Sequence, residues 1–468
     1  MEKEFDLVCI GAGPGGYVAA IKASQLGKKV AIVDISSERI GGVCLNEGCI
    51  PTKSIIQASK IYASCKNFSP LFNLSLSGAR PQMKQIVANS QKVVEALRRG
   101  VVYLFKKNRI TFIEGKAQLE AQHKVIVESS DGKKEILEAQ DIILACGSRP
   151  KKVNGLEVDG EKIISSSQAI KLDYLPKNIL IVGAGAIGVE FASLFSNFGS
   201  NVFLVELERN ILPQEDEDIS KALSLAFKKR KIAIYLESKI SSLDKSKDSL
   251  KVEINTPKGK EEIGVDLVLV AAGRVPNTDF QDFSKLGIEL TGDGFVKVDD
   301  YMHTSIDNVY AVGDITGTKM FAHTAYKQAE VAIEALCDKD SHPFNVMNIP
   351  SIIYSDIEVA SVGLTEKEAK EQNLDYLIAK QPFKANARAV VYSQGEGLLK
   401  IIVDKKTKQF LGAHILGPQA SEIIHQFVIA KSSGINVDHM ATFSYGHPTF
   451  SEIAKDACLS IFQKPIHS

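Results

Sequence analysis

Residues 5–16 read FDLVCIGAGPGG, an apolar run that passes directly into a glycine-rich turn. A helical pattern follows through Leu26, and a second apolar run, residues 30–33, ends at Asp34. An apolar strand, a glycine turn, a helix, a second strand and an acid in this order are typical of a Rossmann unit. The stretch therefore predicts a βαβ unit that binds a dinucleotide.

Each glycine of this turn has a physical reason. Gly11 permits the tight turn, Gly13 lets the backbone approach a pyrophosphate, and Gly16 lets the helix pack close to the strand. The N-terminus of the helix then faces the phosphates with its partial positive charge. Asp34 is placed to hydrogen bond with ribose hydroxyls.

Residues 179–206 repeat the same order. An apolar run leads into the turn Gly183-Ala-Gly185-Ala-Ile-Gly188, and a helix and a second strand end at Glu206. Each acid stands 18 residues beyond the last glycine of its motif, because 34 − 16 and 206 − 188 are both 18. One such motif could be an ordinary glycine turn between a strand and a helix. Two copies in register favour two dinucleotides per chain.

Glu206 also bears on the second dinucleotide. A carboxylate accepts hydrogen bonds from a free ribose hydroxyl but repels a phosphate at that position. NAD is therefore favoured over NADP, although Arg209 stands nearby.

Between the two units lies GGVCLNEGCIPTK, residues 41–53, with Cys44 and Cys49 five residues apart. Two cysteines one helical turn apart can form a small disulfide ring if the turn is distorted, and Gly48 eases that distortion. Such a strained disulfide is suited to exchange with a dithiol. Lys53, one turn after Cys49, could stabilise a thiolate or a reduced flavin. Two buried core thiols, or half of a zinc site, are the alternatives.

The bulk composition excludes several classes of protein. The chain has 468 residues, enough for three or four domains, with 44% hydrophobic and 24% charged residues. Lys plus Arg equals Asp plus Glu at 56 each, so composition predicts no nucleic-acid partner and no membrane surface. No apolar run approaches the roughly 18 residues of a membrane span. The acidic start at Glu2 and Glu4 is unlike a signal peptide, so we expect a cytoplasmic protein, with a mature organelle protein whose presequence has been removed as the alternative.

His447 is followed five residues later by Glu452, at an expected helix start. An imidazole moves protons near neutral pH, and a carboxylate can orient it and raise its basicity. A lone histidine is more often structural, so this pair gains weight from the motifs around it. The seven cysteines, an odd number, predict no secreted disulfide framework, and no metal site is expected.

These motifs resemble those of the flavoprotein disulfide reductases over essentially the whole chain. The likeness rests on GAGPGG, GGVCLNEGCIPTK, GAGAIGVE, AAGRVPNT, VYAVGD and GHPTFSE, in the family's order and rough spacing. Small departures are Asp34 for the more common Glu, Glu47 for an apolar residue, Cys146 for Thr, and Ser444-Tyr445 before Gly446. None of these departures falls on Cys44, Cys49, His447 or Glu452.

The resemblance implies FAD and NAD as cofactors and an oxidation of protein-bound dihydrolipoyl groups to lipoyl groups. It implies exchange with substrate at Cys44 and contact with the flavin at Cys49. It implies further that His447 and Glu452 come from the opposite subunit of a homodimer. The partners would be lipoyl-bearing acyltransferases or carrier proteins of 2-oxoacid dehydrogenase or glycine cleavage complexes.

The remaining cofactor contacts also come from the resemblance. Asp314, at the end of the expected strand 308–314, would bind the ribityl or phosphate region of FAD, and Ala322 would lie near the flavin. Glu190 would face Lys53 across the flavin, although a solvated helix residue is the plainer interpretation. The resemblance also implies cofactor contacts at Gly147 and Gly273.

The predicted fold is α/β, with two Rossmann-like domains, a central domain and a C-terminal α+β dimerisation domain. We expect an FAD-binding domain at residues 1–150, an NAD-binding domain at 151–275, a central domain at 276–349 and an interface domain at 350–468. Two rival interpretations are a sister reductase acting on glutathione, trypanothione or mercuric ion, and a flavin-binding scaffold without turnover. Glu206 and an end without an extra cysteine pair disfavour the first rival.

Overall fold

The computed structural model describes residues 3–68, 71–72, 74, 78–245, 249–337, 339, 342–464 and 466–467. The chain divides into two compact units. The first unit comprises Met1–Ser54, Val87–Lys151 and Arg274–Val346. The second unit comprises Ile55–Ile86, Lys152–Gly273 and Met347–Ser468.

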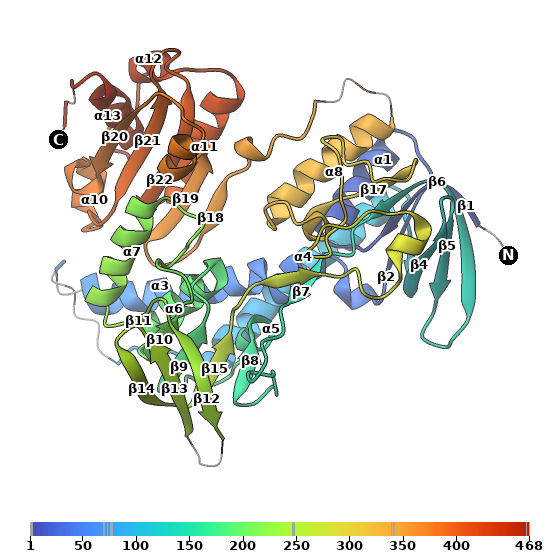
Figure 1. Ribbon diagram of the computed structural model, residues 1–468, viewed down its shortest axis with the longest axis horizontal. Coiled ribbons are helices and arrows are strands. Elements are labelled where there is room, and N and C mark those ends of the chain that lie inside the picture. The colour runs from blue at the N-terminus through green and yellow to red at the C-terminus, as the bar shows by residue number, and fades with distance from the viewer. Residues whose placement is uncertain are drawn as a thin grey trace. The chain divides into compact units, whose positions relative to one another are not determined.

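The first unit is built on a seven-stranded sheet with strand order β3-β2-β1-β6-β5-β4, in which β17 also pairs with β6 (Figure 1). The strands are β1 (Lys3–Ile10), β2 (Val30–Asp34), β3 (Thr111–Glu114), β4 (Lys116–Ala121), β5 (Lys124–Glu128), β6 (Lys134–Leu144) and β17 (Val309–Ala311). A short antiparallel pair joins β7 (Ser148–Pro150) to β16 (Arg274–Pro276). The helices are α1 (Pro14–Gln25), α2 (Gly42–Glu47), α8 (Ala322–Leu336) and the 3-10 helices η1 (Ser37–Arg39), η2 (Phe283–Leu286) and η3 (Gly313–Thr316).

Helices α3 (Cys49–Phe68) and α4 (Met83–Lys107) each have residues in both units. The central strands of the first sheet are parallel, with Cys9 of β1 paired to Ile32 of β2 on one side and to Ile143 of β6 on the other. Residues 7–10 are buried on both faces, as continuous apolar runs in a parallel sheet require.

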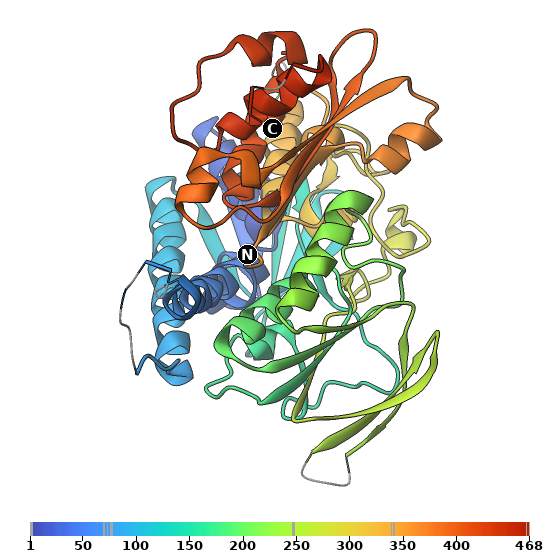
Figure 2. The ribbon, with the colours of Figure 1, turned by 90° about the vertical axis from the view of Figure 1, so that its left-hand side faces the viewer.

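The second unit contains a five-stranded parallel sheet with order β11-β10-β9-β15-β8. Its elements are β8 (Ile163–Ser165), α5 (Ser166–Ala169), β9 (Asn178–Val182), α6 (Ala186–Phe198), β10 (Asn201–Val205), α7 (Glu217–Lys229), β11 (Ala233–Tyr235) and β15 (Leu267–Val270). A three-stranded antiparallel sheet, β12 (Lys239–Asp244), β13 (Leu250–Thr256) and β14 (Gly259–Val265), packs against it through a shared apolar cluster. Figure 2 shows this green to yellow-green layer.

The C-terminal part of the second unit is an antiparallel sheet with order β18-β19-β22-β21-β20. Its strands are β18 (Ser351–Ile353), β19 (Glu358–Gly363), β20 (Tyr376–Pro382), β21 (Leu398–Asp404) and β22 (Phe410–Gly417). Helices α11 (Ala420–Ser432), α12 (Val437–Thr442) and α13 (Glu452–Ile461) share its apolar core. The shorter helices are η4 (Val346–Asn348), α9 (Glu366–Glu371), η5 (Phe383–Ala385) and α10 (Ala387–Val391).

The predicted fold class and both βαβ units are confirmed. The expected strand 308–314 is shorter than predicted, because β17 ends at Ala311 and Asp314 lies in η3. Gly313 has a φ of +81°, which breaks the strand before Asp314. Residues 246–248 lie outside the described residues. The boundaries of the four expected domains stay predictions.

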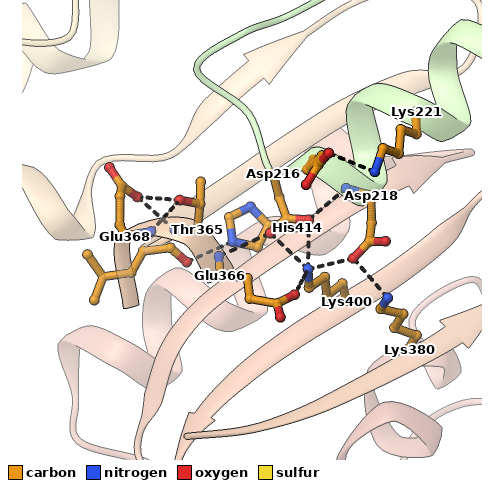
Figure 3. Close-up of polar contacts among 11 residues, drawn as sticks. Asp216, Asp218, Lys221, Thr365, Glu366, Glu368, Lys380, Lys400 and His414 are labelled. Atoms are coloured by element: carbon orange, nitrogen blue, oxygen red, sulfur yellow. Dashed lines mark hydrogen bonds and ion pairs between the residues drawn. The ribbon is translucent and has the colours of Figure 1, made fainter. Parts of the chain in front are cut away.

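A buried ionic cluster joins the N-terminus of α7 to the C-terminal sheet within the second unit (Figure 3). The Nζ atom of Lys400 lies 2.8 Å from Asp216 Oδ1, 2.6 Å from Asp218 Oδ2 and 2.6 Å from Glu366 Oε2. The Lys400 side chain is 1% exposed. Burial by itself would lower the pKa of Lys400, but the hydrogen bonds that it donates to the three carboxylates raise that pKa well above its ordinary value.

This cluster predicts a position-dependent loss of stability. Lys400→Met leaves Asp216 buried without its ammonium partner, so the unfolding free energy should fall by about 3–5 kcal/mol. The matched control is Lys380→Met, because Lys380 binds the same Asp218 at 2.9 Å but is 49% exposed. The control should lose at most about 1 kcal/mol. Urea unfolding followed by circular dichroism measures both, and equal small losses would contradict the buried role.

Candidate active site and dinucleotide-binding turns

The first glycine turn joins β1 to α1 and leaves the helix N-terminus open. Gly13 is the N-cap of α1, and no side chain caps the helix there. A Cβ on Gly16 would lie 1.8 Å from the Gly11 carbonyl oxygen, so only glycine permits this close packing. A Cβ on Gly13 would meet only the Cα of Gly42, at 3.7 Å. Unpaired helix N–H groups beside an uncrowded backbone fit a pyrophosphate.

Asp34 is fastened to this turn. Its Oδ2 accepts a hydrogen bond from Ala12 N at 2.7 Å, and its Oδ1 accepts one from Ile35 N at 2.7 Å. Burial raises the pKa of Asp34, and the two backbone hydrogen bonds offset only part of that rise. The carboxylate keeps further lone pairs for ribose hydroxyls.

The second glycine turn has the same geometry between β9 and α6. A Cβ on Gly188 would lie 1.9 Å from the Gly183 carbonyl oxygen, and one on Gly185 would meet nothing within 4 Å. Glu206, directly after β10, accepts hydrogen bonds from Ala184 N at 2.6 Å and from Glu208 N at 3.0 Å. The two turns are thus built alike, and both fit a dinucleotide.

The cysteine pair lies at a helix break. Helix α2 ends at Glu47, Gly48 has φ −133° and ψ −111°, and α3 begins at Cys49. A Cβ on Gly48 would lie 3.0 Å from the Val43 carbonyl oxygen. Both side chains are thiols in this structure, and that of Cys44 hydrogen bonds with Cys49. The break therefore brings the two sulfurs together.

The pKa of Cys44 depends on its cysteine partner, on burial and on the charge of Lys53. The hydrogen bond with Cys49, then burial, raises the pKa of Cys44 well above its ordinary value, and Lys53 acts in the opposite direction. Once a close pair of thiols has lost one proton, the two sulfurs share the remaining proton, which is then harder to remove. The positive charge of Lys53 is therefore placed to stabilise the thiolate state of the pair.

Several residues of this region were missed by the sequence reasoning. Asn46 Nδ2 donates to the carbonyl oxygens of Arg39, Ile40 and Gly42 at 3.3, 3.1 and 2.9 Å, which holds the loop before the cysteines. An asparagine inside a helix is unfavourable, and that was a usable signal.

Two tyrosines, one of α1 and one of α8, lie within electrostatic reach of the cysteine pair. The hydroxyls of Tyr17 and Tyr326 lie 2.8 Å apart, and their rings meet edge to face. Burial is the main cause that raises the pKa of each, and Cys44 acts electrostatically on both. No motif marked Tyr326, because α8 packs against α1 from the far end of the unit's sequence.

Asp314 belongs to a polar group in the first unit. Its Oδ2 accepts a hydrogen bond from Ser148 Oγ, and Arg274 Nε donates to the same Oγ at 2.7 Å. A Cβ on the adjoining Gly147 would meet nothing within 4 Å, and the same holds for Gly273. Ala322 is the first residue of α8. Open backbone beside a carboxylate suits the sugar and phosphate part of a cofactor.

Glu190 is a buried residue of α6, so its interpretation as a solvated helix residue is wrong. Its Oε1 accepts a hydrogen bond from Tyr354 N at 2.9 Å. Glu190 lies in the second unit and Lys53 in the first, and their expected meeting across a flavin stays a prediction.

His447 and Glu452 form an imidazole–carboxylate dyad in the second unit. His447 Nδ1 lies 2.9 Å from Glu452 Oε1, and Thr449 N donates to Glu452 Oε2 at 2.8 Å. Burial would raise the pKa of Glu452, but the hydrogen bonds from Thr449 and His447 lower it overall. The imidazole is 66% exposed, so its second nitrogen is available to a reactant.

The dyad loop is held by a residue that sequence reasoning left without a role. Asn386 is buried, its Nδ2 donates to the Thr449 carbonyl oxygen at 3.0 Å, and its Oδ1 accepts from Ala389 N at 3.0 Å.

Among the described residues, no group of three or more His, Cys, Asp or Glu side chains could hold a metal ion. No described helix has the length and apolar character of a membrane span.

The chain belongs to the pyridine nucleotide-disulphide oxidoreductase family. Residues 5–329 match that family, and residues 349–458 match its dimerisation domain. It is therefore an FAD- and NAD-dependent oxidoreductase, and the dimerisation domain indicates a homodimer.

Several similar relatives are named dihydrolipoyl dehydrogenase, and two others, from Glycine max and Vigna unguiculata, are named leghemoglobin reductase. The chain is 38% identical to the mitochondrial dihydrolipoyl dehydrogenase 1 of Arabidopsis thaliana, over 99% of this chain and 92% of that protein. It is 37% identical to the dihydrolipoyl dehydrogenase of Zymomonas mobilis, over 100% of both. The crystal structure of LpdA from Mycobacterium tuberculosis superposes with a TM-score of 0.90 at 24% identity, covering 98% of this chain and 99% of that one. The likeness to LpdA shows a shared fold.

The second turn predicts a change in nucleotide choice. Glu206→Gln keeps an amide oxygen for Ala184 N but removes the charge that repels a phosphate. The KM for NAD should rise about tenfold, equal to about 1.4 kcal/mol, and the preference for NAD over NADP should shrink. Steady-state kinetics with both nucleotides measures this. Glu208→Gln, at an exposed neighbour, should change neither value, and an unchanged preference in Glu206→Gln would contradict the assignment.

Proposed function

We propose that this chain is a dihydrolipoyl dehydrogenase, which oxidises protein-bound dihydrolipoyl groups and reduces NAD. The observation that carries the proposal is the Cys44–Cys49 pair, held within hydrogen-bond reach at the Gly48 break. The names of relatives that match over the whole chain support it.

In the proposed first step, His447 acts as the general base. Its exposed Nε2 accepts the proton of one substrate thiol, and Glu452 stabilises the resulting imidazolium through Nδ1. The substrate thiolate attacks Cys44 Sγ of the oxidised pair. A mixed disulfide forms, the Cys44–Cys49 bond breaks, and Cys49 leaves as a thiolate.

In the second step, the remaining substrate thiol loses its proton and attacks the substrate sulfur of the mixed disulfide. The lipoyl disulfide closes, and Cys44 departs as a thiolate that takes up a proton. The substrate has lost two electrons and the cysteine pair has gained them. FAD, when bound, supplies the route by which these two electrons leave the pair for NAD.

The binding roles are proposed residue by residue. Gly11, Gly13, Gly16 and Asp34, with Gly147 and Asp314, would hold FAD, with Ala322 and Lys53 near its ring. Gly183, Gly185, Gly188 and Glu206, with Glu190 and Gly273, would hold NAD. The open helix N-termini and the two acids fastened to the turns support this division.

The assembly is also part of the proposal. His447 and Glu452 would complete the active site of the opposite subunit in the homodimer, which the exposure of His447 supports. The partners would be lipoyl-bearing acyltransferases or carrier proteins of 2-oxoacid dehydrogenase or glycine cleavage complexes. The cytoplasm is also the proposed location.

Removal of one sulfur tests the redox pair. Cys49→Ser removes the thiolate that must leave, so NAD reduction by dihydrolipoamide should fall by about a thousandfold or more. Cys65→Ser, in the same helix α3, should retain full turnover. Anaerobic assays on the purified holoenzyme measure both, and full activity in Cys49→Ser would disprove the scheme.

Removal of the base tests the dyad. His447→Gln should lower kcat for dihydrolipoamide by about 10²–10⁴-fold, because proton removal from the substrate thiol loses its acceptor. His439→Gln, on the exposed side of α12, serves as control and should be unaffected. Absorbance of the purified variants checks that cofactor is retained. A fully active His447→Gln variant would remove His447 from its proposed role.

A further inference from the structure

A second imidazole–carboxylate pair lies next to the dyad. Asp456 follows Glu452 by four residues on α13, so both carboxylates are on the same face of the helix. His467 Nδ1 lies 3.5 Å from Asp456 Oδ2. Asp456 is buried, whereas the His467 side chain is 60% exposed.

The backbone of His467 is held in place from β20. Gln381, a buried residue of that strand, donates its Nε2 hydrogen to the His467 carbonyl oxygen. Ser460 Oγ of α13 donates to the Asp456 carbonyl oxygen at 2.8 Å and lies 3.5 Å from Gln381 Oε1. A buried amide thus joins the strand, the helix and residue 467, and this contact keeps the second imidazole near Asp456.

The two carboxylates act on one another and on His467. Burial is the main cause that raises the pKa of Asp456, the charge of Glu452 raises it further, and His467 opposes both. His467 also helps to lower the pKa of Glu452, after the hydrogen bonds from Thr449 and His447. One imidazole therefore stands within electrostatic reach of both acids, the catalytic one and its neighbour.

We propose that His467 and Asp456 are positioning residues that set the net charge behind the His447–Glu452 dyad, and thereby the acidic limit of dithiol oxidation. A charged Asp456 with a charged His467 contributes no net charge to the dyad. Without His467, the extra negative charge favours the imidazolium form of His447. Without Asp456, the extra positive charge disfavours the imidazolium form of His447. The inference rests on the proposed function, in which His447 is the base.

Other titratable groups lie on α13 and on the elements packed against it. Lys455 of α13 acts on Asp456, and its Nζ donates to the Phe443 carbonyl oxygen. Lys380 of β20 and Lys400 of β21 are both bound to Asp218. The remaining titratable groups on the elements packed against α13 are Asp438 and His439 of α12, Tyr376 of β20 and Asp404 of β21. Burial, and then the charge of Cys458 on α13 itself, raises the pKa of Tyr445.

The test is the pH profile of kcat/KM for dihydrolipoamide in the holoenzyme. His467→Gln should move the acidic limb upward by about half a pH unit, and Asp456→Asn should move it downward by a similar amount, as a unit charge several ångströms away predicts. The double variant should return near the wild-type profile. Asp438→Asn makes the same charge change on exposed α12 and should leave the limb in place.

Opposite shifts distinguish this role from a structural one. Shifts of both single variants in the same direction, or no shift in His467→Gln, would overturn the proposal. Because His467 is exposed, His467→Gln decides the question even if Asp456→Asn fails to fold. A wild-type holoenzyme that does not oxidise dihydrolipoamide would instead contradict the proposed function.

Discussion

The helix break at Gly48 is the constraint on which the proposed chemistry depends. An uninterrupted helix would keep Cys44 and Cys49 on successive turns, whereas the break brings their sulfurs within hydrogen-bond reach. Asn46 holds the preceding loop through three backbone carbonyls, so the distortion is built into the fold.

The two glycine turns share one arrangement of hydrogen bonds. In each, the acid at the end of the second strand accepts a hydrogen bond from the backbone N–H between the first two glycines, Ala12 for Asp34 and Ala184 for Glu206. The same carboxylate that would bind a ribose thus stabilises the turn that would bind the phosphates. The proposed cofactor site is therefore preorganised by the residues that would contact the cofactor.

Much of the fold could be predicted because local patterns control it. Apolar runs and glycine turns marked both βαβ units, and the dyad of His447 and Glu452 spans only five residues. The Lys400 cluster could not be predicted, since Lys400 and Asp216 are 184 residues apart and each resembles an ordinary surface charge. The end of β17 was also misjudged, because the φ of Gly313 and not the apolar pattern ends the strand.

The sequence by itself determined the family, the two dinucleotide-binding turns, the cysteine pair and the dyad, because each of these motifs is encoded over a short stretch. Only the tertiary structure decided which charged groups are buried and what they contact. Glu190 became a buried acceptor for Tyr354, Asn386 a support for the dyad loop, and His467 a neighbour of Asp456. The reason is physical: the burial and pairing of a charge depend on elements far apart in the chain, which no local pattern describes.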